Sequence, residues 1–341
     1  MLPACIRRLR PDAFVMALLG TVTVATLLPC QGTSARLFHA LGLFAIASLF
    51  FLQGARLSRE SILAGMTNWK LHAAIAATTF ALFPVLGTAL IAMMPHALDR
   101  TLVLGVLFLC ALPSTVQSSI ALTSIAQGNV AGAVCAATAS SLIGMVFTPL
   151  LFGFMSRVRG GGIDISGMWQ VFAELLLPFA AGHLLRPWIG LWAGRNKKLL
   201  AITDRGSILI VVYTAFSAAV MHGIWHQVPP VMLATLAAIV ATLLAIGLLI
   251  TSAGARVCGF AHADEVALVF CGSQKSLVAG IPIASVLFGG PMLGVVVLPI
   301  MIYHPLQLVV CAWLARRYAG RPVAPVMATG GALLPVRAAV R

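Results

Sequence analysis

Two stretches of the sequence place polar side chains beside helix-breaking residues inside long apolar segments. The first runs from Pro113 to Thr123, and the second runs from Gly272 to Pro282. A bilayer offers no water to a freed backbone group, so an interrupted helix survives at membrane depth only where protein or a wet cavity covers it. Interruptions at corresponding places in two halves of a chain mark the binding site of a membrane transporter. The two stretches are therefore the candidate functional site.

The first stretch carries hydroxyl and amide groups at a density that does not suit contact with lipid. Pro113 removes a backbone donor and clashes with the preceding turn, so it breaks the helix that begins near Leu102. The polar side chains that follow are Ser114, Thr115, Gln117, Ser118, Ser119 and Thr123. Serine and threonine also hold membrane helices together, and this role is preferred for Thr138, Ser140 and Ser141 in the next segment. For the cluster after Pro113, a substrate or ion site is preferred.

The second stretch holds a basic side chain deep in an apolar segment. Gly272 loosens the helix and Pro282 ends or kinks it. Between them lie Ser273, Gln274, Lys275 and Ser276. A charge at the bilayer centre costs about 3 kcal/mol or more, so such a residue is a functional candidate by default. Lys275 stands near mid-span, about ten residues after Glu265 at ~1.5 Å per residue, which argues against snorkelling to the interface.

Lys275 has two possible roles at such a break. Broken helices expose N-terminal ends that favour anions and C-terminal carbonyls that favour cations. The ammonium could therefore hold a carboxylate of the substrate. Alternatively, it could supply the positive charge that another transporter takes from a bound ion.

The composition places most of the chain in a membrane. Of 341 residues, 60% are hydrophobic and 9% are charged, and the mean hydropathy is +1.03. A soluble domain carries roughly 25% charged residues. The formal net charge is +14, but the basic residues lie in short loops between apolar runs, which is an orientation signal and not a nucleic-acid interface. The expected partners are a lipid bilayer and a small molecule, with no nucleic acid.

Ten apolar segments have about the length that crosses a bilayer, ~20 residues for ~30 Å. Their ranges are 13–29, 37–54, 71–94, 102–126, 130–154, 169–185, 207–222, 232–251, 266–287 and 292–314. The first could be a cleaved signal peptide, but an uncleaved helix is preferred. With a cytoplasmic N-terminus, 17 of the 22 Lys and Arg residues lie on the cytoplasmic side, four lie on the other side, and Lys275 lies within the ninth segment. This bias predicts ten spans with both termini cytoplasmic, in the cell inner (plasma) membrane.

The spans divide into two halves of five. We expect a first repeat over 1–156, a linker over 157–168, a second repeat over 169–316 and a cytoplasmic tail over 317–341. An odd number of spans in each half inverts the second half relative to the first. Gln117–Ser119 resembles Gln274–Ser276, 157 positions later, and Phe147–Pro149 resembles Tyr303–Pro305, 156 positions later. Chance similarity in Ser- and Ala-rich helices is the alternative explanation.

Other ionisable residues carry weaker signals. Glu174 and His183 lie on different faces of one helix, and His304 suits a packing role. Asp264 and Glu265 are expected to cap the start of the ninth helix. Neither a phosphate loop nor a nucleophile motif is present, and the seven cysteines have no disulfide or zinc spacing, so no enzyme, catalytic residue or metal centre is expected.

At these residues the chain resembles the bile acid:sodium symporter family, and most of all its divergent SBF-like bacterial branch of sodium-dependent transporters. The resemblance covers nearly the whole chain. It is carried by Phe51–Leu57, Leu112–Ser119, Gln127–Asn129, Thr148–Leu150, Ser273–Ser276 and Gly280–Pro282. It implies an all-α fold of ten helices in two inverted repeats, with broken helices 4 and 9 crossing in a core. Helices 1, 2, 6 and 7 form a panel, and an organic anion binds between core and panel.

The sequence departs from the sodium-coupled members of that family at both crossovers. Their Pro-Gly-Gly followed by Ser-Asn is here Pro113–Thr115 followed by Ser118 and Ser119. Phe270 stands where they have a glutamate, and Lys275 replaces an asparagine, although Gln274 matches. A sodium ion would meet repulsion and too few oxygens. Sodium is therefore retained only as a candidate ion, and the Lys275 ammonium is expected to occupy or abut its position.

The sequence predicts a secondary transporter of a small organic anion that works by alternating access between core and panel. The residues expected at the substrate or ion site are Ser114, Thr115, Gln117, Ser118, Ser119, Thr123, Ser273, Gln274, Lys275 and Ser276. The alternative is a non-transporting membrane regulator of calcium influx that keeps the crossover as structure. An intramembrane enzyme is disfavoured because no catalytic set exists. No oligomeric state is predicted.

Overall fold

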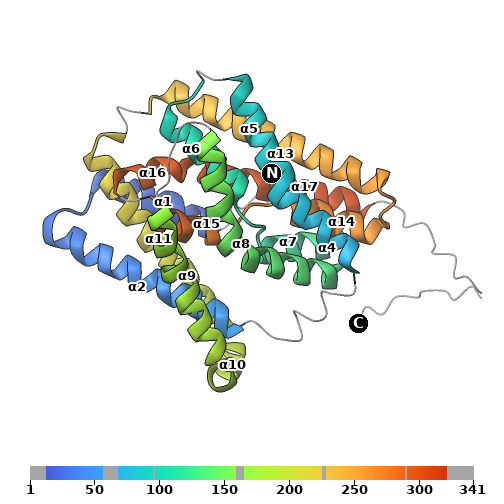
Figure 1. Cartoon of the computed structure of the whole chain (residues 1–341), viewed down its shortest axis with the longest axis horizontal. Helices are drawn as coiled ribbons and strands as arrows, with labels where there is room; N and C mark the ends of the chain where they lie inside the picture. The colour runs from blue at the N-terminus through green and yellow to red at the C-terminus, as the bar shows by residue number, and fades with distance from the viewer. Residues whose placement is uncertain are drawn as a thin grey trace, which may run out of the picture.

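The computed structural model describes residues 13–56, 68–94, 97–158, 165–224, 228–288 and 290–320, and these are helical, without strands (Figure 1). Three sets of predicted features lie outside the described residues: the N-terminal basic cluster of Arg7, Arg8 and Arg10, residues 159–164 of the linker, and the tail after residue 320.

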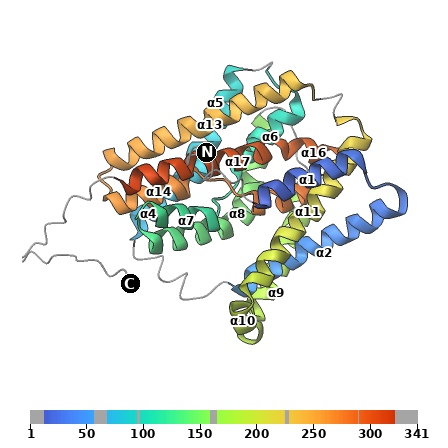
Figure 2. The ribbon, with the colours of Figure 1, turned by 180° about the vertical axis from the view of Figure 1, so that it is seen from behind.

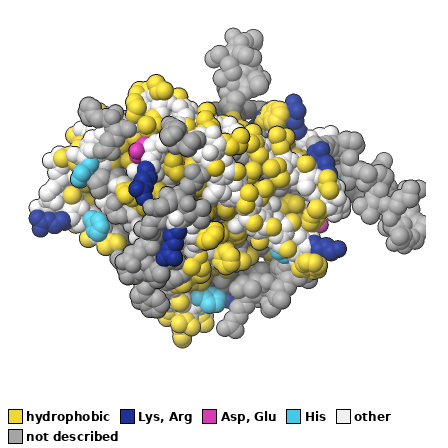
Figure 3. Space-filling view, turned by 45° about the horizontal axis from the view of Figure 1, so that its top comes forward, with side chains coloured by type: hydrophobic (Ala, Val, Ile, Leu, Met, Phe, Trp, Pro, Cys, Tyr) yellow, Lys and Arg dark blue, Asp and Glu magenta, His cyan; other side chains and the backbone are white. Residues whose placement is uncertain are grey.

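Seven helices of the described part are long and apolar enough to cross a membrane. They span Gly32–Arg56, Trp69–Met93, Val130–Arg157, Lys198–Met221, Pro230–Val257, His262–Leu287 and Met292–Ala319. Three shorter apolar helices span Ala13–Leu27, Arg100–Ala111 and Ala173–Leu184. Large apolar side chains such as Phe44, Trp188 and Leu191 are exposed, and hydrophobic side chains cover much of the face in Figure 3. The chain is therefore an α-helical, multi-pass membrane protein.

One group of helices is built from α1 (Ala13–Leu27), α2 (Gly32–Arg56), α9 (Ile165–Leu184), α10 (Arg186–Arg195) and α11 (Lys197–Met221). We call this group the panel. Within it, α2 packs against α9 and α11, and α1 packs against α11 (Figures 1 and 2). The seventh apolar segment was expected to begin at Ser207, but its helix begins ten residues earlier because the polar turns before it are also helical.

The remaining helices form a second group, which we call the core. They are α4 (Trp69–Ala77), the π-helix η3 (Thr78–Leu82), α5 (Phe83–Met93), α6 (Arg100–Ala111), α7 (Gln117–Ile125), α8 (Val130–Val158), α13 (Pro230–Val257), α14 (His262–Ser273), α15 (Leu277–Leu287), α16 (Pro291–Val296) and α17 (Leu298–Ala319). The π-helix joins α4 to α5, so these three elements make one continuous apolar helix.

Both predicted helix breaks are present. The first helix, α6, ends at Ala111, and Leu112 is extended with ψ 148° because the residue before a proline is driven out of the helical region. The second, α14, ends at Ser273, and Gln274 is extended with ψ 141°. The Ser276 hydroxyl then caps α15 by accepting a 3.1 Å hydrogen bond from the Ala279 N–H. The helix does not end at Pro282, one of the two effects expected of that residue, because α15 runs through it to Leu287.

Candidate functional site

The two helix breaks meet, and backbone atoms join them. The Ser276 N–H donates a 2.9 Å hydrogen bond to the Pro113 carbonyl. A side-chain amide also bridges the breaks, since the Gln274 Oε1 atom accepts hydrogen bonds from the hydroxyls of Thr115, Ser118 and Ser119. Within the described residues, the buried Gln274 amide nitrogen has no hydrogen-bond partner. The polar residues that follow Pro113 and those around Gln274 therefore belong to one cluster, although they are about 160 residues apart in sequence.

Lys275 is fully buried at this crossing and points into the core. Its Nζ atom donates to the carbonyl oxygens of Thr79, Cys110 and Leu112 at 2.8, 2.9 and 2.8 Å. It also lies 4.5 Å from the centre of the Phe83 ring, which faces a cation favourably. An ammonium group has three donors, so all three are used. The ammonium of Lys275, which lies between α14 and α15, therefore compensates the partial negative charge at the C-terminal end of α6.

Neighbouring helices satisfy the backbone groups that the two breaks release. Gln307 of α17 accepts from the Lys275 N–H at 2.8 Å and donates to the Lys275 carbonyl at 2.9 Å. Tyr303 of the same helix donates to the Ser273 carbonyl at 2.7 Å. On the other side, Thr148 of α8 donates to the Ala111 carbonyl at 2.8 Å. Each break is thus supported by a different long helix, as interrupted membrane helices require.

A cavity of about 520 Å³ lies between the panel and the core. Its core wall comes from α7, α8, α15, α17 and both breaks, and its panel wall comes from α1, α2, α9 and α11. The predicted site residues that line it are Thr115, Gln117, Ser118 and Ser276. Thr138, Ser141 and His304, for which the sequence favoured packing roles, also line it. A volume of this size suits a small organic molecule.

The other predicted site residues lie behind the cavity wall. The Ser114 N–H bonds to the Ser140 hydroxyl, and the Ser119 hydroxyl contacts the Phe270 carbonyl at 3.3 Å. Ser273 bonds to the Val269 carbonyl of its own helix. Gln274 and Lys275 are buried in the crossing.

The hydroxyl of Thr123 has no hydrogen-bond partner within the described residues. It is buried near Gly128 at the far end of α7, where a Cβ on Gly128 would lie 2.9 Å from the Thr123 methyl group. Thr123 is not among the residues that line the cavity.

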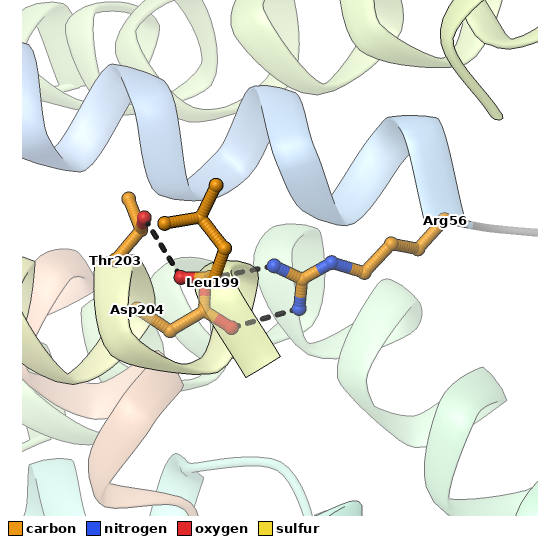
Figure 4. Close-up of polar contacts among 4 residues, drawn as sticks. All are labelled: Arg56, Leu199, Thr203 and Asp204. Carbon is orange, nitrogen blue, oxygen red and sulfur yellow. Dashed lines mark hydrogen bonds and ion pairs between the residues drawn. The ribbon is translucent and has the colours of Figure 1, made fainter. Parts of the chain in front are cut away.

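Charged residues on the panel wall were not singled out by the sequence. Arg56, the last residue of α2, donates two hydrogen bonds to the Asp204 carboxylate of α11 at 2.7 and 3.1 Å (Figure 4). Arg205, the next residue of α11, also lines the cavity. The sequence signal was present but was interpreted as loop charge that orients the protein in the membrane.

Phe270 and the acidic pair of α14 have structural surroundings. The Phe270 ring is fully buried and lies 6.1 Å from the Tyr318 ring, centre to centre. Asp264 accepts from the side-chain amides of Asn68 and Asn129 at 3.2 and 2.7 Å. Glu265 accepts from Arg256 at 3.0 Å and from the Tyr318 hydroxyl at 2.9 Å. Both carboxylates lie in the first turn of α14, as expected, and also tie it to its neighbours.

Comparisons with known proteins agree with this architecture. Residues 12–320 match the model of the SBF-like CPA transporter family. An uncharacterised protein of Pseudomonas aeruginosa is 50% identical over 92% of this chain and 95% of its own length. A protein of Escherichia coli K12 named "Putative symporter YfeH" is 50% identical over 90% of this chain and 92% of its own length. The sodium/bile acid cotransporter 7 of Rattus norvegicus is 26% identical over 92% of this chain and 97% of its own length. The predicted resemblance is thereby confirmed: the chain belongs to the SBF-like CPA transporter family, whose members are transporters and not enzymes.

Proposed function

We propose that this protein is a secondary transporter of a small organic anion and that it works by alternating access between the core and the panel. The observation that carries the proposal is the cavity of about 520 Å³ between the two groups, whose core wall includes residues of both crossing breaks. Transporters place their substrate where two interrupted helices meet, and they expose the site alternately by moving one bundle against the other.

Ten spans in two inverted repeats are part of this proposal. Each of the ten predicted segments overlaps one of the seven long or three shorter apolar helices of the described residues. The helix pairings support the symmetry: α2 contacts α9 as α1 contacts α11, and α5 contacts α6 as α13 contacts α14. Likewise α6 contacts α17 as α14 contacts α8. With a linker over 157–168 and a cytoplasmic tail from 317, both termini lie on the cytoplasmic side of the inner membrane. The cavity then faces the cytoplasm, because the end of α2 and the start of α11 line it.

The ammonium of Lys275 is proposed to replace a coupled cation. Three carbonyl oxygens converge on it, an arrangement that binds hard cations in other proteins. An additional sodium ion does not fit at this point, since the ammonium holds all three oxygens and Phe270 supplies no carboxylate. The sodium named for the bile acid cotransporter relatives is therefore not proposed as the coupling ion here.

Uptake by proteoliposomes tests the proposal. The purified protein is reconstituted and uptake of radiolabelled organic anions is measured with sodium and with choline outside. We expect uptake that is equal in both media in the wild type, and loss of uptake or a new ion dependence in Lys275→Met. Lys70→Met removes an exposed lysine at the start of α4 and serves as the matched control.

The results separate the alternatives. Folded protein that takes up no organic anion, and that alters calcium influx in cells, would favour the regulator instead. Unchanged uptake and unchanged ion dependence in Lys275→Met would remove that residue from the mechanism.

A further inference from the structure

The charges on the panel wall of the cavity are not balanced. Asp204 is buried and accepts a hydrogen bond from each terminal nitrogen of Arg56. The two side chains therefore form a bidentate ion pair with no net charge. Arg205 is exposed and has no acidic partner within the described residues. Apart from His304 on the core wall, these three are the acidic and basic residues of the lining among the described residues, so one arginine charge remains in excess.

The position of Arg205 is consistent with recognition of a ligand. Its guanidinium lies 5.8 Å from the centre of the Phe14 ring, another cavity residue. A guanidinium that lies over an aromatic ring can still form paired hydrogen bonds with a carboxylate or sulfonate. Across the cavity, α7 and α15 begin at the wall, and the N-terminal ends of helices also favour negative charge.

Apolar side chains occupy the rest of the lining. Phe179, Ile208, Leu142 and Leu308 come from both walls, and the hydroxyls of Thr115 and Ser118 lie among them. Pockets of this kind bind the body of a small molecule by apolar contact and orient it with a few polar groups. The cavity therefore suits a ligand with one charged end and an apolar body.

We propose that Arg205 binds the anionic group of the substrate and that the cavity selects organic monoanions over dianions, because Arg56 is neutralised by Asp204. This inference rests on the proposed transport function and makes it more specific. It assigns anion recognition to the panel, and it leaves Lys275 with a role inside the core.

Thermal stabilisation of the purified full chain tests the inference. The probes are aliphatic, aromatic and steroid monocarboxylates and monosulfonates, each paired with the dianion of the same skeleton and with its neutral amide. A ligand that binds only the native state raises the unfolding midpoint. We expect stabilisation by monoanions in the wild type, less by dianions and none by amides. Arg205→Gln should weaken monoanion binding about 10- to 100-fold, the usual range for a lost charge-assisted hydrogen bond, and Arg205→Lys should restore part of it.

Two further variants sharpen the result. Arg195→Gln removes an exposed arginine of α10 that does not line the cavity, and it should leave binding unchanged. Asp204→Asn releases Arg56 and should shift the preference toward dianions; its midpoint without ligand reports any loss of folding. Equal binding of monoanions by Arg205→Gln and wild type would overturn the inference and leave Arg205 as an arginine of the membrane interface. Failure of every anion to bind the wild type would overturn the transport proposal as well.

Discussion

The Ser276 N–H and the Pro113 carbonyl are 2.9 Å apart and hydrogen-bonded, so the two interrupted helices are joined backbone to backbone. Both partners are backbone atoms, so no long side chain bridges the two helices here. The bond requires both breaks to lie at the same depth and in direct contact. Backbone groups freed within a membrane must find partners in the protein. Here the second break supplies the donor and the first break supplies the acceptor of one such hydrogen bond.

Lys275 should exclude sodium from the three carbonyl oxygens that it contacts. In Lys275→Ala the oxygens of Thr79, Cys110 and Leu112 lose their donors, and unsatisfied buried groups cost about 1–3 kcal/mol each. We expect a lower unfolding midpoint that rises when sodium chloride replaces choline chloride, because a small cation can enter the vacated space. The wild type should show no such difference. A sodium effect of equal size in both proteins would mean that sodium binds elsewhere.

Gln307 should stabilise the second break through the backbone of Lys275. Gln307→Leu keeps a similar volume but removes both hydrogen bonds to that backbone, and we expect a loss of about 2–4 kcal/mol of unfolding free energy. Thermal unfolding in detergent measures the change. Gln31→Leu, at an exposed glutamine, is the control and should have little effect. A Gln307→Leu protein as stable as the control would show that water replaces the lost bonds.

The close packing of α2 against α9 should depend on two glycines. A Cβ on Gly182 would lie 1.9 Å from the Phe51 carbonyl oxygen, and one on Gly54 would lie 2.0 Å from the Phe179 carbonyl oxygen. The nearest atoms belong to the backbone of the facing helix, so the helices must separate, and we expect Gly182→Ala to cost about 3 kcal/mol or more. Gly20→Ala in α1 meets no atom within 4 Å and should be neutral or stabilising. Equal unfolding midpoints for the two variants would contradict this packing.

The broken helices could be predicted because their cause is local. Pro113 excludes a helix at Leu112, and polar residues beside it have no place among acyl chains. The buried lysine was equally clear, because a lone charge at mid-span is rare. Its partners were not predictable, since they are backbone oxygens, and any residue type supplies these. Gln307 was missed for a related reason: one glutamine in an apolar helix does not reveal which backbone it contacts.

Two other features of the site needed the three-dimensional structure. Gly272 and Pro282 were both expected to disturb the second segment, but the helix does not end at Pro282. The break falls directly after Gly272 and Ser273, and Ser276 begins a new helix by capping it. The 157-residue offset between Gln117 and Gln274 also does not align the breaks, since Gln117 is the first residue of α7 and Gln274 precedes α15 by three positions. Arg56 and Arg205 were counted as loop charges, because nothing in their sequence neighbourhood places them beside a cavity.

Gly294 should control the end of the core–panel interface that is closed in this structure. It lies in α16, and a Cβ there would be 2.6 Å from the Ala219 Cβ and 3.1 Å from the Ala215 carbonyl oxygen, both in α11 of the panel. A leucine at this position cannot fit while the two helices remain in contact, so Gly294→Leu should shift the population toward a state that opens on this side.

Cysteine labelling measures that shift. In a background without native cysteines, Ala215→Cys is buried and should react slowly with a membrane-impermeant maleimide added outside cells. Adding Gly294→Leu should increase the labelling rate several-fold, whereas adding Gly254→Leu, whose Cβ position in α13 has no atom within 4 Å, should not. Faster labelling from the cytoplasmic side instead would reverse the proposed orientation, and slow labelling in every variant would contradict alternating access at this interface.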